Sequence, residues 1–168
     1  MSGPPFRIAL LDRGQDLSTF ASGSPSLDRY LREQATQDIR RRVAACFVAV
    51  TDESRVAGYY TLASASMLLA ELPAATAKKL PRYPTVPAVR MGRLAIDKAF
   101  RGQGLGAALL ADALQRAAHS EIASFALLVD AKDRHAAAFY QHHGFIAFPD
   151  TPGTLFLPLA TASAARGT

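Results

Sequence analysis

The turn at residues 101–106 constrains the fold of this chain more than any other feature, because it reads Arg-Gly-Gln-Gly-Leu-Gly and joins a predicted strand to a predicted helix. Residues 88–96 have the apolar character of a strand, and residues 105–119 are rich in Ala and Leu, which favours a helix. Glycine lets a backbone approach a ligand closely, and the first amides of a helix point out of its positive end. The turn therefore predicts a cradle for an anion.

Two nucleotide-binding patterns compete for this turn. The turn lacks the Gly-Lys-Ser/Thr ending of a Walker loop, so nucleoside triphosphate chemistry is not expected. The looser dinucleotide pattern fits Gly102, Gly104 and Ala107, with Asp130 at the end of the next predicted strand. A dinucleotide fold needs further βαβ units after such a turn, and only 38 residues follow Asp130. The short remainder of the chain argues against a dinucleotide fold, which is kept as the alternative interpretation of this turn.

Hydrophobic periodicity predicts strands alternating with helices along the whole chain. The predicted strands are residues 6–11, 43–50, 56–67, 88–96, 123–130, 145–148 and 154–157. Helices are predicted from a cap at Ser26 and over residues 73–80, 105–119 and 133–143. The apolar stripe of the first helix comprises Leu27, Tyr30, Leu31, Ala35 and Ile39. Gly58 predicts a bulge or a close contact in its strand. The helix after residue 96 is a crossover, so the strands on either side of it should be parallel in a mixed sheet.

Length and composition favour one globular domain. The chain has 168 residues, 49% of them hydrophobic, so we expect a single domain over residues 1–160 and a small-residue tail over 161–168. No apolar run approaches the roughly 20 residues that span a bilayer, and no signal peptide is apparent, which predicts a cytoplasmic protein without a membrane partner. The single cysteine, Cys46, excludes an internal disulfide, and the spacing of the histidines predicts no metal site.

The charge of the chain is concentrated in one window. The formal net charge is +5, and residues 78–101 hold seven Lys or Arg residues against one acid, Asp97. Such a window favours an anionic cofactor or a polyanionic partner. We single out five of its residues as candidates for binding phosphates: Lys78, Lys79, Arg82, Arg90 and Arg93.

Arg101, Gly104 and Gly106 fit the pattern Gln/Arg-x-x-Gly-x-Gly/Ala, and in this respect the chain resembles the GNAT N-acetyltransferase superfamily over about residues 6–159. The resemblance implies an α/β fold with a mixed, mostly antiparallel sheet, flanking helices and a parallel strand pair that splays around acetyl-CoA. It implies that the turn amides hold the cofactor's pyrophosphate. The cofactor-binding residues that it implies are Leu94, Ala95, Ile96, Arg101, Gly102, Gln103, Gly104, Leu105, Gly106, Asp133 and Ala136.

Seven segments are more narrowly similar to the GNAT toxins of bacterial toxin–antitoxin pairs, which acetylate the α-amine of aminoacyl-tRNA. They are residues 27–31, 56–62, 92–97, 104–113, 131–133, 139–140 and 144–145. The chain departs from that group at Asp130, where His is usual, and at residues 123–126, where an Arg is usual. The resemblance implies an aminoacyl-tRNA acceptor, a ribbon-helix-helix antitoxin and a homodimer. The alternatives are a GNAT enzyme for a protein or small-molecule amine, and a non-catalytic acyl-CoA-binding partner of a DNA-binding antitoxin.

Acetyl transfer to an amine expels a thiolate, so a proton donor near the sulfur assists the reaction. Tyr140 is the predicted donor, because a phenol keeps its proton at neutral pH and the resemblance gives this role to the Tyr of the Phe-Tyr pair. The alternative is a core tyrosine that packs against Ala136. Asp133 also has the position of a helix N-cap, and no residue is assigned as a base.

Overall fold

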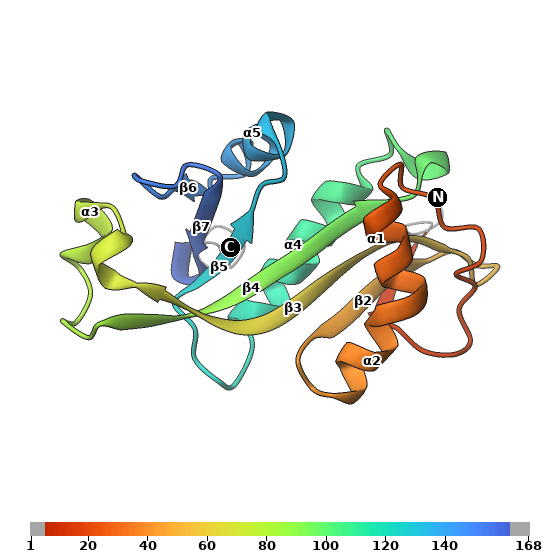
Figure 1. Cartoon of the computed structure of the whole chain (residues 1–168), viewed down its shortest axis with the longest axis horizontal. Coiled ribbons are helices and arrows are strands. Elements are labelled where there is room, and N and C mark those ends of the chain that lie inside the picture. The colour runs from red at the N-terminus through yellow and green to blue at the C-terminus, as the bar shows by residue number, and fades with distance from the viewer. Residues whose placement is uncertain (1–5, 162–168) are drawn as a thin grey trace. The chain divides into compact units, whose positions relative to one another are not determined.

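The computed structural model describes residues 6–161 and contains a seven-stranded sheet (Figure 1). The strands are β1 (Arg7–Leu10), β2 (Ala45–Val50), β3 (Val56–Leu68), β4 (Thr85–Ile96), β5 (Ala126–Asp130), β6 (Ile146–Ala147) and β7 (Thr154–Pro158). They are hydrogen-bonded in the order β1-β2-β3-β4-β5-β7-β6. The β4–β5 pair is parallel, and the β1–β2, β2–β3, β5–β7 and β6–β7 pairs are antiparallel. The predicted mixed, mostly antiparallel sheet and its parallel pair are confirmed.

Helical segments connect the strands. The α-helices are α1 (Pro25–Arg29), α2 (Ala35–Arg40), α3 (Ala74–Ala77), α4 (Leu105–Ala118) and α5 (Arg134–His142). A π-helical turn, η1 (Tyr30–Gln34), joins α1 to α2, and η2 (Leu69–Glu71) and η3 (Lys98–Phe100) are 3-10 turns. Among the described residues, no helix has the length and apolar character needed to cross a membrane.

The chain divides into two compact units. The first unit contains residues 1–63 and 92–113, and the second contains residues 64–91 and 114–168. The strands β3 and β4 and the helix α4 each contribute to both units. A single domain over residues 1–160 therefore stays a prediction. Of the predicted tail, residues 162–168 lie outside the described residues.

The core of the first unit lies between its strands and the α1–η1–α2 segment (Figure 1). Tyr30, Leu31 and Ala35 of the predicted apolar stripe are buried there, and Leu27 and Ile39 pack against them. The β2–β3 hairpin has a register shift at Ala49, which pairs with Gly58. A Cβ atom on Gly58 would lie 3.0 Å from the carbonyl oxygen of Ala95. Of the two alternatives predicted for Gly58, the close contact is confirmed, and the irregularity of the hairpin lies directly beside it.

The start of the first helix differs from the prediction. Its N-cap is Ser24, whose hydroxyl accepts a hydrogen bond from the Leu27 amide, and Ser26 lies inside the helix. Pro25 occupies the first helical turn, where its missing N–H costs nothing, so the helix begins before the predicted cap.

The core of the second unit lies between the β4–β5–β7 strands and the segment around α3. Residues 88–91 of β4 pair in register with residues 126–129 of β5. β4 begins at Thr85 rather than at the predicted residue 88, because the chain is already extended there and the carbonyl of Pro87 accepts a hydrogen bond from Phe125. At the other end of this unit, α5 begins after the predicted N-cap Asp133 and ends before Gly144, which has a φ of +94°.

Candidate active site

The glycine turn lies in the first unit, between η3 and α4. Gly102 and Gly104 have φ angles of +79° and +76°, a backbone region that other residues rarely adopt. A Cβ atom at either glycine would have no neighbour within 4 Å, so the space beside the turn is open. α4 continues for 14 residues from Leu105, and the first amides of such a helix lack partners within it. The geometry fits the predicted anion cradle.

The side chain of Arg101 fastens the turn to the segment before α1. Its guanidinium donates a hydrogen bond to the carbonyl of Ser22. The amide of Lys98 donates to the carbonyl of Ala21 over 2.9 Å. The Arg101 side chain is therefore used in a contact within the protein, and the backbone of the turn is the part that is available to a ligand.

Asp97 strengthens the same attachment, and the sequence reasoning did not assign it a role. Its side chain is almost completely buried and accepts hydrogen bonds from the amides of Ala21 (3.0 Å) and Ala99 (2.8 Å). Arg55 lies 3.6 Å from the same carboxylate, with its guanidinium over the ring of Phe100. An acidic residue directly between a strand and a helical turn is the N-cap signal that could have identified Asp97.

The predicted pantetheine strand, residues 94–96, lies at the end of β4 that belongs to the first unit. The parallel pairing of β4 with β5 covers residues 88–91, so residues 94–96 lie beyond it. Ala95 is buried in the core, and Leu94 and Ile96 are half-buried. The backbone of these residues is the part that a bound amide chain would use.

Tyr140 belongs to α5 in the second unit and is buried, with 7% of its surface exposed. Its ring lies 5.4 Å from the rings of Phe139 and Phe145, measured between centroids. Burial, reinforced by the negative charge of Asp130, raises the pKa of Tyr140 to about 12. The hydroxyl makes no hydrogen bond to any residue in the range 6–161. At neutral pH the Tyr140 hydroxyl therefore keeps its proton, and in the described part of the chain no protein group accepts a hydrogen bond from it.

The start of α5 holds two further predicted cofactor residues. The carboxylate of Asp133 accepts a hydrogen bond from the amide of Ala136 over 2.8 Å, so both residues belong to the helix cap. This contact explains Asp133 through folding alone. A role of either residue toward a cofactor stays a prediction.

The five predicted phosphate-binding residues do not share one environment. Lys78, Lys79 and Arg82 are exposed in the segment between α3 and β4. Arg90 forms an ion pair with Asp130, whose carboxylate also accepts a hydrogen bond from Thr154 over 2.9 Å. In the first unit, Arg93 lies 3.5 Å above the ring of Tyr30, and the Tyr30 hydroxyl donates to Asp38. Only the first three of these basic residues combine exposure with the absence of a partner among residues 6–161.

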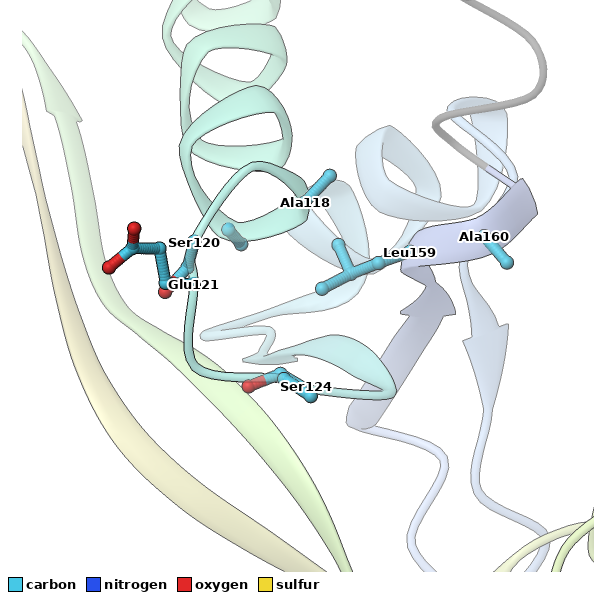
Figure 2. Close-up of a pocket in the computed structure, with 8 residues that line it drawn as sticks. Ala118, Ser120, Glu121, Ser124, Leu159 and Ala160 are labelled. Carbon is cyan, nitrogen blue, oxygen red and sulfur yellow. The ribbon is translucent and has the colours of Figure 1, made fainter.

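A cavity of about 350 Å³ lies in the second unit, where α4 ends and the chain approaches β5 (Figure 2). Its walls are formed by the last residues of α4, by that connection and by the chain after β7. Figure 2 shows the side chain of Leu159 pointing toward the connection between α4 and β5. The side chain of Glu121, which belongs to that connection, points away from Leu159. None of the predicted site residues lines this cavity.

Known proteins match this chain along most of its length. The model of the acetyltransferase (GNAT) family matches residues 12–145. A tRNA-acetylating toxin of Mycobacterium tuberculosis is 40% identical over an alignment of 171 positions, which covers 99% of each chain. The solved structure of AtaT complexed with acetyl-methionyl-tRNAfMet has a TM-score of 0.88 and 31% identity, and covers 96% of this chain and 99% of the other.

A further solved structure, AtaTR bound with AcCoA, has a TM-score of 0.84 and 30% identity, with 96% of this chain and 98% of the other covered. The TM-scores show that these solved structures share the fold described above over nearly the whole chain. The chain belongs to the GNAT family of acetyltransferases.

Proposed function

We propose that this protein transfers the acetyl group of acetyl-CoA to the α-amine of an aminoacyl-tRNA, and that it thereby blocks translation as a toxin. The observation that carries the proposal is its similarity, over almost the whole chain, to the mycobacterial tRNA-acetylating toxin. The AtaT structures, one with acetyl-methionyl-tRNAfMet and one with AcCoA, support the same acceptor and donor.

The turn between η3 and α4 holds the diphosphate of acetyl-CoA in this proposal. Its left-handed glycines leave open space, and its amides lie at the positive end of a long helix, which favours negative charge. The backbone at Leu94 and Ile96 pairs with the amides of the pantetheine arm, because β4 continues there beyond its pairing with β5. The family resemblance is the support for a further role of Asp133 and Ala136 in binding this cofactor.

Tyr140 is the general acid. The chemistry that acetyl-CoA supplies is an acetyl group activated as a thioester. As the amine nitrogen bonds to the carbonyl carbon and the carbon–sulfur bond breaks, Tyr140 donates its hydroxyl proton to the departing sulfur. Its raised pKa keeps the proton in place until the thiolate develops. The attacking amine loses its surplus proton through water, and Tyr140 is reprotonated by the same route.

The acceptor is held by positive charge. Lys78, Lys79 and Arg82 present cations that pair with no residue in the described part of the chain, and such cations suit the phosphates of an RNA. Arg90 and Arg93 supply weaker attraction, because a carboxylate neutralises the first and an aromatic ring covers part of the second.

We extend the proposal to the partners and the place of action. AtaT has been solved bound to the C-terminus of its antitoxin AtaR, which supports a protein antitoxin for this chain. We propose that this antitoxin is of the ribbon-helix-helix class, that the enzyme is a cytoplasmic homodimer, and that residues 1–160 form one GNAT domain. The family match over residues 12–145 includes parts of both compact units and supports the last point.

The deciding experiment supplies labelled acetyl-CoA together with charged tRNA, or with a panel of free amines and peptides. We expect label on the α-amine of charged tRNA, and a loss of about 10²- to 10⁴-fold in kcat for Tyr140→Phe. Arg13→Gln, an exposed change in the first unit, is the matched control and should leave kcat unchanged. Label found on small amines or peptides alone would replace the tRNA acceptor by one of those classes.

A further inference from the structure

Tyr83 stands out on the surface of the second unit. Its side chain is 69% exposed, and it is the one aromatic residue among the large apolar side chains that are exposed in the described part of the chain. A tyrosine usually covers its ring with protein when it can, so a ring that faces water is a feature to be explained.

The segment that carries Tyr83 is held in place by packing of the residues on either side of it against the core of the second unit. Leu72 and Val86 are buried on either side of it, and Leu80 packs against the same core cluster. The amide of Leu69 donates a hydrogen bond to the carbonyl of Pro84 over 3.0 Å. Prolines at positions 81 and 84 restrict the backbone on both sides of the ring. Tyr83 is therefore presented to solvent by a constrained segment.

Positive charge surrounds this ring in the sequence. Lys78, Lys79 and Arg82 are exposed, and none of them forms an ion pair or a side-chain hydrogen bond with a residue in the range 6–161. Glu71 is the one acidic residue between positions 53 and 97, and it forms no ion pair with these cations in the described part of the chain. One constrained segment of six residues, 78–83, therefore carries three exposed cations and an exposed ring, a combination that suits an anion with a flat apolar face.

We infer that Tyr83 is a stacking platform for an unpaired base of the RNA acceptor, and that Lys78, Lys79 and Arg82 hold the neighbouring phosphates. This inference rests on the proposed function, because it names the part of the acceptor that this surface binds. Single-stranded RNA alternates flat bases with phosphates, and proteins bind it with aromatic rings set among cations. An acidic peptide would use the cations but would have no need of the ring.

The test measures RNA binding separately from catalysis. Uncharged tRNA is titrated against the wild-type protein and against Tyr83→Ala and Tyr83→Phe. Removing a base–aromatic stack costs about 1–3 kcal/mol, so Tyr83→Ala should raise the Kd by about 5- to 150-fold. Tyr83→Phe keeps the ring and should bind within about twofold of the wild type. Ile122→Ala removes another exposed apolar side chain of the second unit and is the matched control.

Catalysis gives the second readout. Tyr83→Ala should raise the KM for charged tRNA by the same factor, with the KM for acetyl-CoA and the melting temperature unchanged. A Kd for tRNA that Tyr83→Ala leaves at the wild-type value would overturn the inference, as would an equal loss in Tyr83→Phe. Loss of binding to an acidic antitoxin peptide in Tyr83→Ala, with RNA binding intact, would assign the surface to a protein. A wild-type enzyme that leaves charged tRNA unmodified would refute the proposed function instead.

Discussion

Substitution of Asp97 tests how the glycine turn is held, and two effects of different size compete there. Asp97 accepts two backbone hydrogen bonds, from Ala21 and Ala99, and it also faces Arg55. A hydrogen bond to a charged group contributes about 1.5–3 kcal/mol, so the two bonds together contribute about 3 kcal/mol or more. The Arg55 side chain is 38% exposed, and solvent screening limits that ion pair to about 1 kcal/mol or less. The backbone contacts therefore dominate.

The expected results for Asp97 follow from that ranking. Asp97→Ala should lower the free energy of unfolding in urea by about 3–4 kcal/mol, and Asp97→Asn, whose amide oxygen still accepts a hydrogen bond, by about 1–2 kcal/mol. Arg55→Gln should cost about 1 kcal/mol or less. Because Asp97 attaches the turn to residue 21, both Asp97 variants should also weaken binding of acetyl-CoA, measured by calorimetry. An Arg55→Gln variant as destabilised as Asp97→Ala would show that the ion pair, and not the cap, holds the turn.

Three further perturbations have expected outcomes. Burial and the charge of His142 lower the pKa of His143 below 6.5. As the pH drops below 6.5 the unfolded chain therefore takes up a proton before the folded chain does, and the free energy of unfolding should fall. Denaturation at stepped pH should show a shallower fall for His143→Gln. Gly104→Ala places a side chain on a left-handed backbone, so it should lower the free energy of unfolding by about 1–2 kcal/mol and weaken acetyl-CoA binding. An unchanged free energy of unfolding and an unchanged affinity for acetyl-CoA would show that the turn does not need its glycine. Lys79→Gln should reduce the slope of log K for tRNA binding against log salt concentration by about 0.7–0.9. Arg90→Gln should reduce this slope by less, because a carboxylate already neutralises Arg90. Equal reductions in the two variants would contradict the environments assigned to these residues.

Local signals predicted much of this molecule. The turn that contains Gly102 and Gly104 was predicted from its spacing between a strand and a helix, and both glycines have the left-handed backbone that such a turn requires. Asp133 was predicted as a helix N-cap because the residue it caps lies only three positions later. The error at the first helix was also local, since Ser24 and Ser26 are both good caps and the proline between them decides which one is used.

Contacts between distant residues set the limit of that prediction. The sequence predicts phosphate contacts for five residues of the basic window, yet Arg90 pairs with Asp130, 40 positions away, and Arg93 lies over Tyr30, on a different element. The charges along a sequence show how many cations are present, but a cation attracts RNA more weakly when a carboxylate pairs with it or a ring covers it. Sheet pairing makes that choice, because residues 88–91 of β4 lie beside residues 126–129 of β5 and bring Asp130 within reach of Arg90. Among residues 6–161, none of the exposed cations before β4 forms an ion pair, so they and Tyr83 are the part of the window where RNA binding should be most sensitive to substitution.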